Sequence, residues 1–163
     1  MHQAALDFVT ATVRAYGVHG PVYEIGSRNV NGSIRSLFPV QDYHGIDLSA
    51  GPDVDAVADA ESYVPPMVPH TVVCCEVLEH AANADAIIQQ IATVLAPGGR
   101  VILTMAGPCR MPHSGVDGGQ LRAGEFYRNV SPDDLRSWLR DFAQVDVTEN
   151  IDTADVYATA VKP

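Results

Sequence analysis

The segment that most constrains the fold is TVVCC, residues 71–75, the most continuous β-branched run in the chain. A strand without polar alternation is typical of the centre of a parallel sheet, where both faces are covered. Other strand patterns are found at 22–27, 43–49, 54–60, 100–106, 144–150 and 155–161. Helical patterns lie at 2–16, 32–38, 84–96 and 131–142. Strands that alternate with helices in this way predict an α/β fold with a mainly parallel sheet.

The strands and helices together predict one doubly wound domain over residues 1–163. The sheet is expected to have seven strands, with one antiparallel edge strand, because the last two strands are short and can form a hairpin. A length of 163 residues is typical of a single domain. We expect a cytoplasmic protein, since the first residues lack the pattern of a signal peptide and no apolar run reaches the roughly 18 residues of a membrane span.

Acidic residues dominate the charge, with 20 Asp and Glu against 10 Lys and Arg and a net charge of −10. This sign disfavours a broad surface that neutralises phosphates, so nucleic acid is not an expected partner. No Lys or Arg lies between Arg35 and Arg100, whereas residues 107–130 hold three Arg against two acids. The charge pattern therefore predicts an acidic cofactor half and a more basic acceptor half.

Polar and glycine residues follow several of the predicted strands, where ligands of parallel α/β sheets bind. Gly26 permits a close approach of the backbone to a ligand, and a helix that begins near Gly32 would direct free N–H groups to it. Asp47, at the end of the second strand, is placed to accept hydrogen bonds from two ribose hydroxyls. This pattern indicates a nucleoside site.

The motifs around this site narrow the class of cofactor. The chain has no GxxxxGK[ST] sequence, which excludes a P-loop, and EIGSRNVNG does not satisfy the GxGxxG pattern of dinucleotide-binding proteins. A diphosphate would find few cations near the acids between Asp42 and Asp85. A positively charged nucleoside without phosphates remains, and S-adenosylmethionine is such a molecule.

Five motifs in chain order resemble those of class I, Rossmann-like, seven-stranded S-adenosylmethionine-dependent methyltransferases of the type 11-like kind. They are VYEIGSR, GIDLS, VADAE, VVCCEVLEH and LAPGGRVILT, and together they cover nearly the whole chain. VLEH followed about fifteen residues later by LAPGG is the most specific combination. The resemblance implies methyl transfer from S-adenosyl-L-methionine, with S-adenosyl-L-homocysteine as the product.

The resemblance also implies which residues hold the cofactor. Glu24, Gly26 and Ser27 would surround the methionine end, Asp47 the ribose, Asp59 and Ala60 the adenine, and Glu76 would lie near the methyl group, with Arg28 and Leu48 next to these positions. The glycine motif departs from the family pattern, because only Gly26 remains in the turn and Gly32 is displaced. The loop is therefore expected to turn by another route.

The acceptor site is expected from the Gly-rich segment 107–130, which has the composition of a long loop or lid. His80, His113 and Tyr127 are the candidate catalytic residues, and Asp117, Arg122 and Arg128 the candidate substrate-binding residues. His80 has a second interpretation, as a structural residue at the start of a helix. The His and Cys positions show no metal-ligand spacing, so no metal site is expected.

We therefore predict a methyltransferase that acts on a small or medium-sized acceptor, with O- or N-methylation and with an anionic group as the expected recognition element. Two alternatives remain open. One is a non-catalytic S-adenosylmethionine-binding or partner subunit, and the other is methylation of a nucleotide or nucleic-acid group. A homo-oligomer or a partner chain is also compatible with the short sequence.

Overall fold

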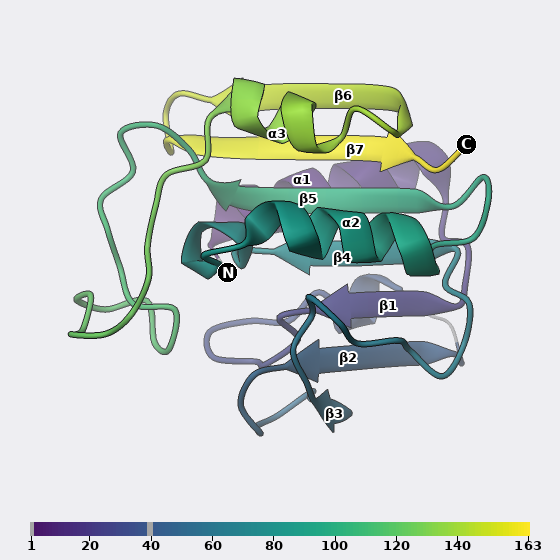
Figure 1. Cartoon of the computed structure of the whole chain (residues 1–163), viewed down its shortest axis with the longest axis horizontal. Helices are drawn as coiled ribbons and strands as arrows, with labels where there is room; N and C mark the ends of the chain where they lie inside the picture. Colours follow the sequence, from purple (N-terminus) through teal and green to yellow (C-terminus); the bar gives the residue numbers. More distant parts are fainter. Residues whose placement is uncertain (1, 39–40) are drawn as a thin grey trace.

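The computed structural model describes residues 2–38 and 41–163 and contains one sheet (Figure 1). Its strands are β1 (Val22–Ile25), β2 (Tyr43–Asp47), β3 (Ala56–Val57), β4 (Thr71–Cys75), β5 (Arg100–Ala106), β6 (Ala143–Asn150) and β7 (Asp155–Val161). The α-helices are α1 (Gln3–Tyr16), α2 (Ala84–Val94) and α3 (Pro132–Trp138). Two short 3-10 turns, η1 (Arg35–Leu37) and η2 (Leu78–His80), complete the elements.

The sheet has seven strands in the order β3-β2-β1-β4-β5-β7-β6. Strands β1 to β5 pair in parallel, and β7 is antiparallel to both β5 and β6. This confirms a mainly parallel seven-stranded sheet with one antiparallel strand. The antiparallel strand β7 lies one place in from the edge, between β5 and β6. β7 is therefore buried along almost its whole length, whereas β6, at the edge, is mostly exposed.

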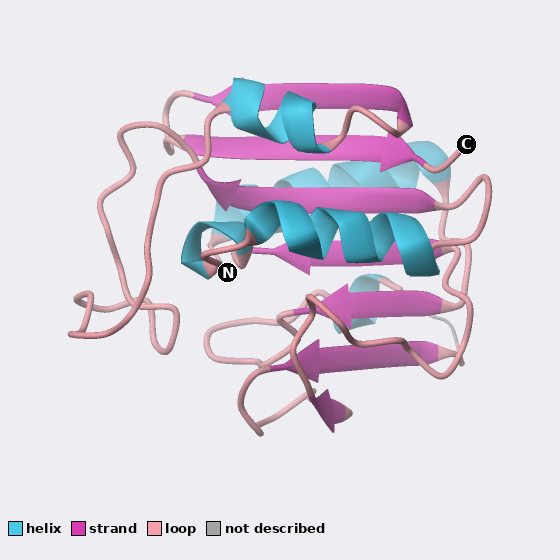
Figure 2. Cartoon of the chain, viewed as in Figure 1, coloured by secondary structure: helices cyan, strands magenta, loops and turns pink. Residues whose placement is uncertain are grey.

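Helices cover both faces of the sheet, as the doubly wound prediction requires. In Figure 2, α2 and α3 lie in front of the sheet and α1 lies behind it. The larger apolar core includes Ile88 and Ile91 of α2 with Leu103 of β5, and the smaller core includes Val9 of α1 with Ile102. Among the described residues, no helix is both long and apolar enough to cross a lipid bilayer.

The predicted helix over 32–38 is wrong, because only the three residues of η1 are helical. The backbone of Gly32 has a φ of 129°, outside the helical region. The Arg35 side chain instead donates hydrogen bonds to the Asp53 carbonyl and the Asp55 carboxylate, which ties the segment to the loop after β2. Pro39, whose ring is expected from the sequence to end a helix over 32–38, lies outside the described residues.

The carboxyl ends of the parallel strands meet at one edge of the sheet, at the left in Figure 1. The long loop over residues 107–130 extends from this edge after β5, and the start of α1 lies there as well. We call residues 107–130 the lid. The fold therefore brings the strand ends, the first residues of α1 and the lid together.

Candidate active site

A cavity of about 840 Å³ lies at this edge of the sheet. The loop after β1, the ends of β2 and β4, and the first part of the lid form its walls. Its volume is within the usual range of small-molecule and cofactor sites. The cavity is therefore the candidate active site.

The turn after β1 is built around Gly26, which has a φ of 78°. A side chain there would place its Cβ 2.2 Å from Cγ2 of Val77. The backbone N–H groups of Gly26 and Ser27 both donate to the Ile46 carbonyl at 2.9 Å. Gly26 alone thus makes the turn in this shortened glycine motif. The two hydrogen bonds to Ile46 hold the chain against the end of β2, and no helix follows directly.

Glu24 reaches the cavity from inside β1 and is buried. Its carboxylate accepts a hydrogen bond of 2.7 Å from the Tyr43 hydroxyl. Burial raises the pKa of Glu24 to about 7, although the Tyr43 hydrogen bond and the nearby Arg35 oppose this shift. A cation in the cavity would favour the ionised form of this carboxyl group.

We expect Glu24→Gln to flatten the pH dependence of stability between pH 4.5 and 7. In this interval the unfolded state has lost the Glu24 proton while the folded state retains it, so stability falls as pH rises. A pKa of about 7 against 4.5 corresponds to a loss of roughly 3 kcal/mol over the interval. Urea unfolding at pH 4.5 and 7 measures this loss. The exposed control Glu149→Gln should keep the wild-type difference, and an unchanged difference in Glu24→Gln would contradict the prediction.

The ends of β2 and β3 form a further part of the cavity wall. Asp47 lines the cavity, and its Oδ1 accepts the Ser49 N–H at 2.9 Å. Leu48 lines the same wall with its side chain exposed. Asp59 accepts the Glu61 N–H at 2.9 Å, and Ala60 beside it is buried against the core. These residues of two neighbouring strand ends thus meet in one wall.

Glu76 follows β4 and also lines the cavity, with a φ of 56°. The Thr104 hydroxyl donates to its Oε1 at 3.0 Å. His2 Nε2 lies 3.5 Å from Glu76 and 3.1 Å from Asp155, a carboxylate that is fully buried at the start of β7. His2 therefore lines the cavity beside the end of β4 and the start of β7.

Three ring side chains meet at the base of the lid. His80, His113 and Tyr127 pack with ring centroids 5.0 to 5.4 Å apart. Burial lowers the pKa of His80 to about 4, helped by the nearby His113, so its imidazole is neutral at pH 7. Burial also raises the pKa of Tyr127 to about 12. His80 and His113 line the cavity, whereas Tyr127 contacts both of their rings without lining it.

Glu79 lies next to this group of rings and is fully buried. Its Oε1 accepts the backbone N–H of Ala106 at 3.1 Å. Burial raises the pKa of Glu79 to about 8, and the charges of Glu76 and Asp155 add to the shift. Glu79, His80 and His113 thus form a group of polar side chains in which the carboxyl group is fully buried.

The lid has an internal hydrogen-bond network around the buried Ser114. The Ser114 hydroxyl donates to Glu125 at 2.7 Å, and Glu125 also accepts the backbone N–H of Arg122 at 2.8 Å. Arg122 pairs with Asp117. Asp117 lines the cavity, whereas the Arg128 guanidinium lies 4.9 Å from the ring centroid of Trp138. Arg122 and Arg128, the two arginines predicted to bind substrate, do not line the cavity, although Asp117, the partner of Arg122, does.

The sequence prediction missed several residues that the structure brings to the site. His2 belongs to none of the five motifs, and Glu79 belongs to VLEH but had no predicted role. Arg110 lies in the lid and also had no predicted role. The Arg110 guanidinium pairs with Asp155 at 3.0 Å and donates to the Thr153 carbonyl at 2.8 Å. A contact over 45 positions has no sequence signal in a single chain, because no local spacing relates the two residues.

The sequence matches the model of a family described as the methyltransferase domain over residues 9–145. The chain belongs to this family, and its fold is that of the class I methyltransferases. The resemblance found from the motifs is thereby confirmed. No match was found among proteins of curated function.

Solved structures support the same fold at low sequence identity. DhpI, solved as a complex with SAH, has a TM-score of 0.72 and 20% identity, covering 98% of this chain and 85% of that chain. The N-methyltransferase NodS from Bradyrhizobium japonicum has a TM-score of 0.70 and 15% identity, covering 98% of this chain and 86% of that chain. The 1,6-didemethyltoxoflavin-N1-methyltransferase from Burkholderia thailandensis has a TM-score of 0.69 and 16% identity, covering 98% of this chain and 78% of that chain.

Proposed function

We propose that the protein transfers a methyl group from S-adenosylmethionine to a nitrogen or oxygen of a small molecule. The observation that carries this proposal is the cavity beside Gly26, with Asp47 in its wall, in a chain of the methyltransferase domain family. The solved neighbours named above include two N-methyltransferases, one named for a small molecule. The acceptor class rests on this likeness and on the size of the cavity.

The charges of the cavity fit this cofactor. Among the described residues, seven carboxylates line the cavity against the guanidinium groups of Arg28 and Arg110. Arg110 is already paired with Asp155, so the wall has a strong excess of negative charge. Such a wall favours a sulfonium and an ammonium group and disfavours a diphosphate.

Each part of the cavity has a separate task in this proposal. Asp47 accepts hydrogen bonds from the ribose, and the small side chain of Ala60 leaves space beside the adenine. Glu24 and Glu76 favour the positive charges at the methionine end. When bound, S-adenosylmethionine supplies an electrophilic methyl group, and the lid excludes water from the acceptor. His80 lines the cavity and is neutral at pH 7, so its imidazole is placed to contact the acceptor without adding a positive charge.

The acidic wall favours a neutral or cationic acceptor, such as an amine. The charge pattern of the sequence predicts an anionic group held by Arg122 and Arg128, but in the structure Arg122 pairs with Asp117 and Arg128 packs on Trp138. The same wall disfavours a nucleotide acceptor.

We expect Asp47→Ala to weaken binding of S-adenosylhomocysteine by about 30- to 100-fold, which corresponds to about 2–3 kcal/mol. Isothermal titration calorimetry of both proteins measures the change, and circular dichroism checks that the fold is retained. Asp146→Ala is the matched control, because Asp146 is exposed on β6 at the far edge of the sheet. Its affinity should equal that of the wild type.

Two outcomes would separate the proposal from its alternatives. Wild-type protein that binds neither S-adenosylmethionine nor S-adenosylhomocysteine would overturn the proposed enzyme. Binding without methyl transfer to any member of an amine and hydroxyl acceptor panel would favour a non-catalytic subunit. Methyl transfer is measured with a radiolabelled methyl group on the cofactor.

A further inference from the structure

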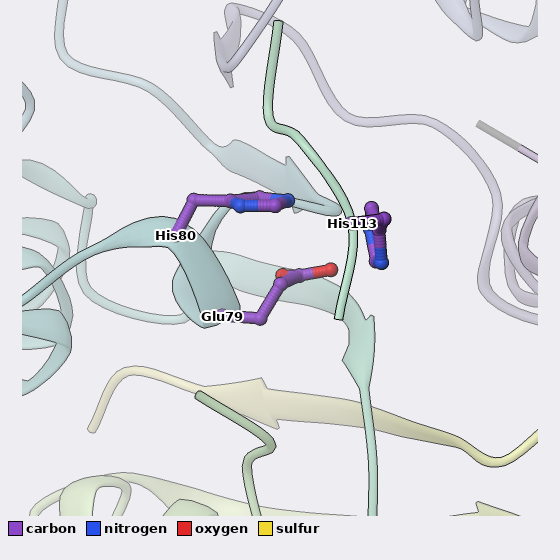
Figure 3. Close-up of side chains that lie close together, drawn as sticks. All are labelled: Glu79, His80 and His113. Carbon is purple, nitrogen blue, oxygen red and sulfur yellow. The ribbon is translucent and has the colours of Figure 1, made fainter. Parts of the chain in front are cut away.

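The group formed by Glu79, His80 and His113 carries an inference beyond methyl transfer. Figure 3 shows Glu79 and His80 of η2 facing His113 of the lid. One ligand atom from each residue lies within 4.8 Å of the others. We infer that these three side chains bind a divalent transition-metal ion, with zinc the best match, between the sheet and the lid.

Two atoms of this group have no hydrogen-bond partner among residues 2–38 and 41–163. They are Oε2 of Glu79 and Nδ1 of His80, and both are buried. The Glu79 residue as a whole is 0% exposed. A buried polar atom without a partner costs about 1–3 kcal/mol, so native proteins usually supply one. A metal ion would give both atoms a partner at once.

The donor set selects the kind of ion. Two imidazole nitrogens and one carboxylate oxygen are typical zinc ligands, and three protein ligands with one open position are typical of catalytic zinc sites. A tetrahedral zinc ion holds its ligand atoms about 3.4 Å apart. The side chains must therefore approach one another slightly when the ion binds.

The proposed ion would also face the cavity, since His80 and His113 are part of its wall. The open coordination position could then take a nitrogen or oxygen atom of the acceptor, a role that rests on the proposed function. Because His113 comes from the lid and Glu79 from the core, the ion would hold the lid closed on the sheet.

A second group of potential ligands, His2, Glu76 and Asp155, lies nearby. Its carboxylates already have partners within the chain. Asp155 pairs with Arg110 and accepts a hydrogen bond from the Tyr157 hydroxyl, and Glu76 accepts one from Thr104. The guanidinium of Arg110 also repels a second cation there. This group is therefore the weaker candidate and serves as a comparison.

The test uses the whole protein, freed of metal with a chelator and titrated with zinc chloride and with cobalt chloride. We expect one ion per chain, micromolar or tighter affinity, and the visible absorption bands of tetrahedral cobalt. Glu79→Gln and His113→Ala should each weaken binding at least about 100-fold. His70→Ala, a change at an exposed histidine far from the group, should leave it unchanged.

Trypsin provides a second measurement, because the lid contains Arg110, Arg122 and Arg128. Zinc should slow cleavage of the lid in the wild type and have no effect in His113→Ala, which changes only a lid side chain. Zinc binding that survives His113→Ala, or that is lost in His2→Ala instead, would overturn the inference. So would the absence of binding at 100-fold molar excess of zinc.

Calorimetry with S-adenosylhomocysteine on the chelator-treated protein separates this inference from the proposed function. Cofactor binding without any zinc binding would reject the metal site and leave the proposed function intact. Zinc binding without cofactor binding would reject the proposed function and leave the metal site intact.

Discussion

Gly26→Ala is expected to lower the free energy of unfolding by about 2–5 kcal/mol. Two costs add at this position. A non-glycine residue at a φ of 78° costs about 1–2 kcal/mol. A Cβ atom 2.2 Å from Cγ2 of Val77 also forces the packing apart, at about 1–3 kcal/mol. Urea unfolding measures the total, and calorimetry should show that binding of S-adenosylhomocysteine is lost as well.

Two further variants separate these costs. Gly98 has nearly the same φ, 76°, but a Cβ there meets no atom within 4 Å, so Gly98→Ala should cost only about 1–2 kcal/mol. In a Val77→Ala background the clash is removed, and Gly26→Ala should then cost the same small amount. Equal costs for Gly26→Ala in both backgrounds would show that Val77 does not limit this turn.

Asp155→Ala is expected to destabilise the protein by about 3–5 kcal/mol, because it leaves Arg110 without its buried partner. Asp155 is fully buried and also accepts a hydrogen bond of 3.0 Å from the Tyr157 hydroxyl. The ion pair joins the start of the lid to β7. The variant should therefore unfold at lower urea concentration, and trypsin should cleave its lid faster under native conditions.

Asp133→Ala is the matched control for this ion pair. Asp133 pairs with Arg136 at 3.0 Å on the surface of α3, where its side chain is 95% exposed. Exposed pairs of this kind contribute about 0–1 kcal/mol. A loss in Asp155→Ala as small as the loss in this control would show that the buried pair does not hold the lid.

Local patterns in the sequence predicted most of the sheet and its helices. The apolar run at β4 and the Ser-Pro-Asp-Asp start of α3 both depend on neighbouring residues, and the structure has a strand and a capped helix there. The prediction of a helix over 32–38 was wrong because contacts with distant residues decide the structure there. The short apolar pattern of this segment suits a helix, but Arg35 is bound by Asp53 and Asp55, which no local pattern includes.

The residues of the candidate site also divide into those that local patterns could locate and those that they could not. Strand-end residues such as Gly26 and Asp47 could be predicted, because a motif and its position on a strand define them together. The lid residues could be assigned to a loop but not to contacts. Arg122 and Arg128 looked available for a substrate by charge alone, whereas the structure pairs one with Asp117 and packs the other on Trp138.

The place of β7 in the sheet has a consequence for how the chain folds. β7 comes after both of its neighbours in the sequence, yet it pairs with β5 along seven residues and separates β5 from β6. During synthesis, the apolar edge of β5 stays open until β7 has left the ribosome. An open edge of this kind is prone to pair with other chains. The hairpin thus covers this edge only after all the parallel strands have been made.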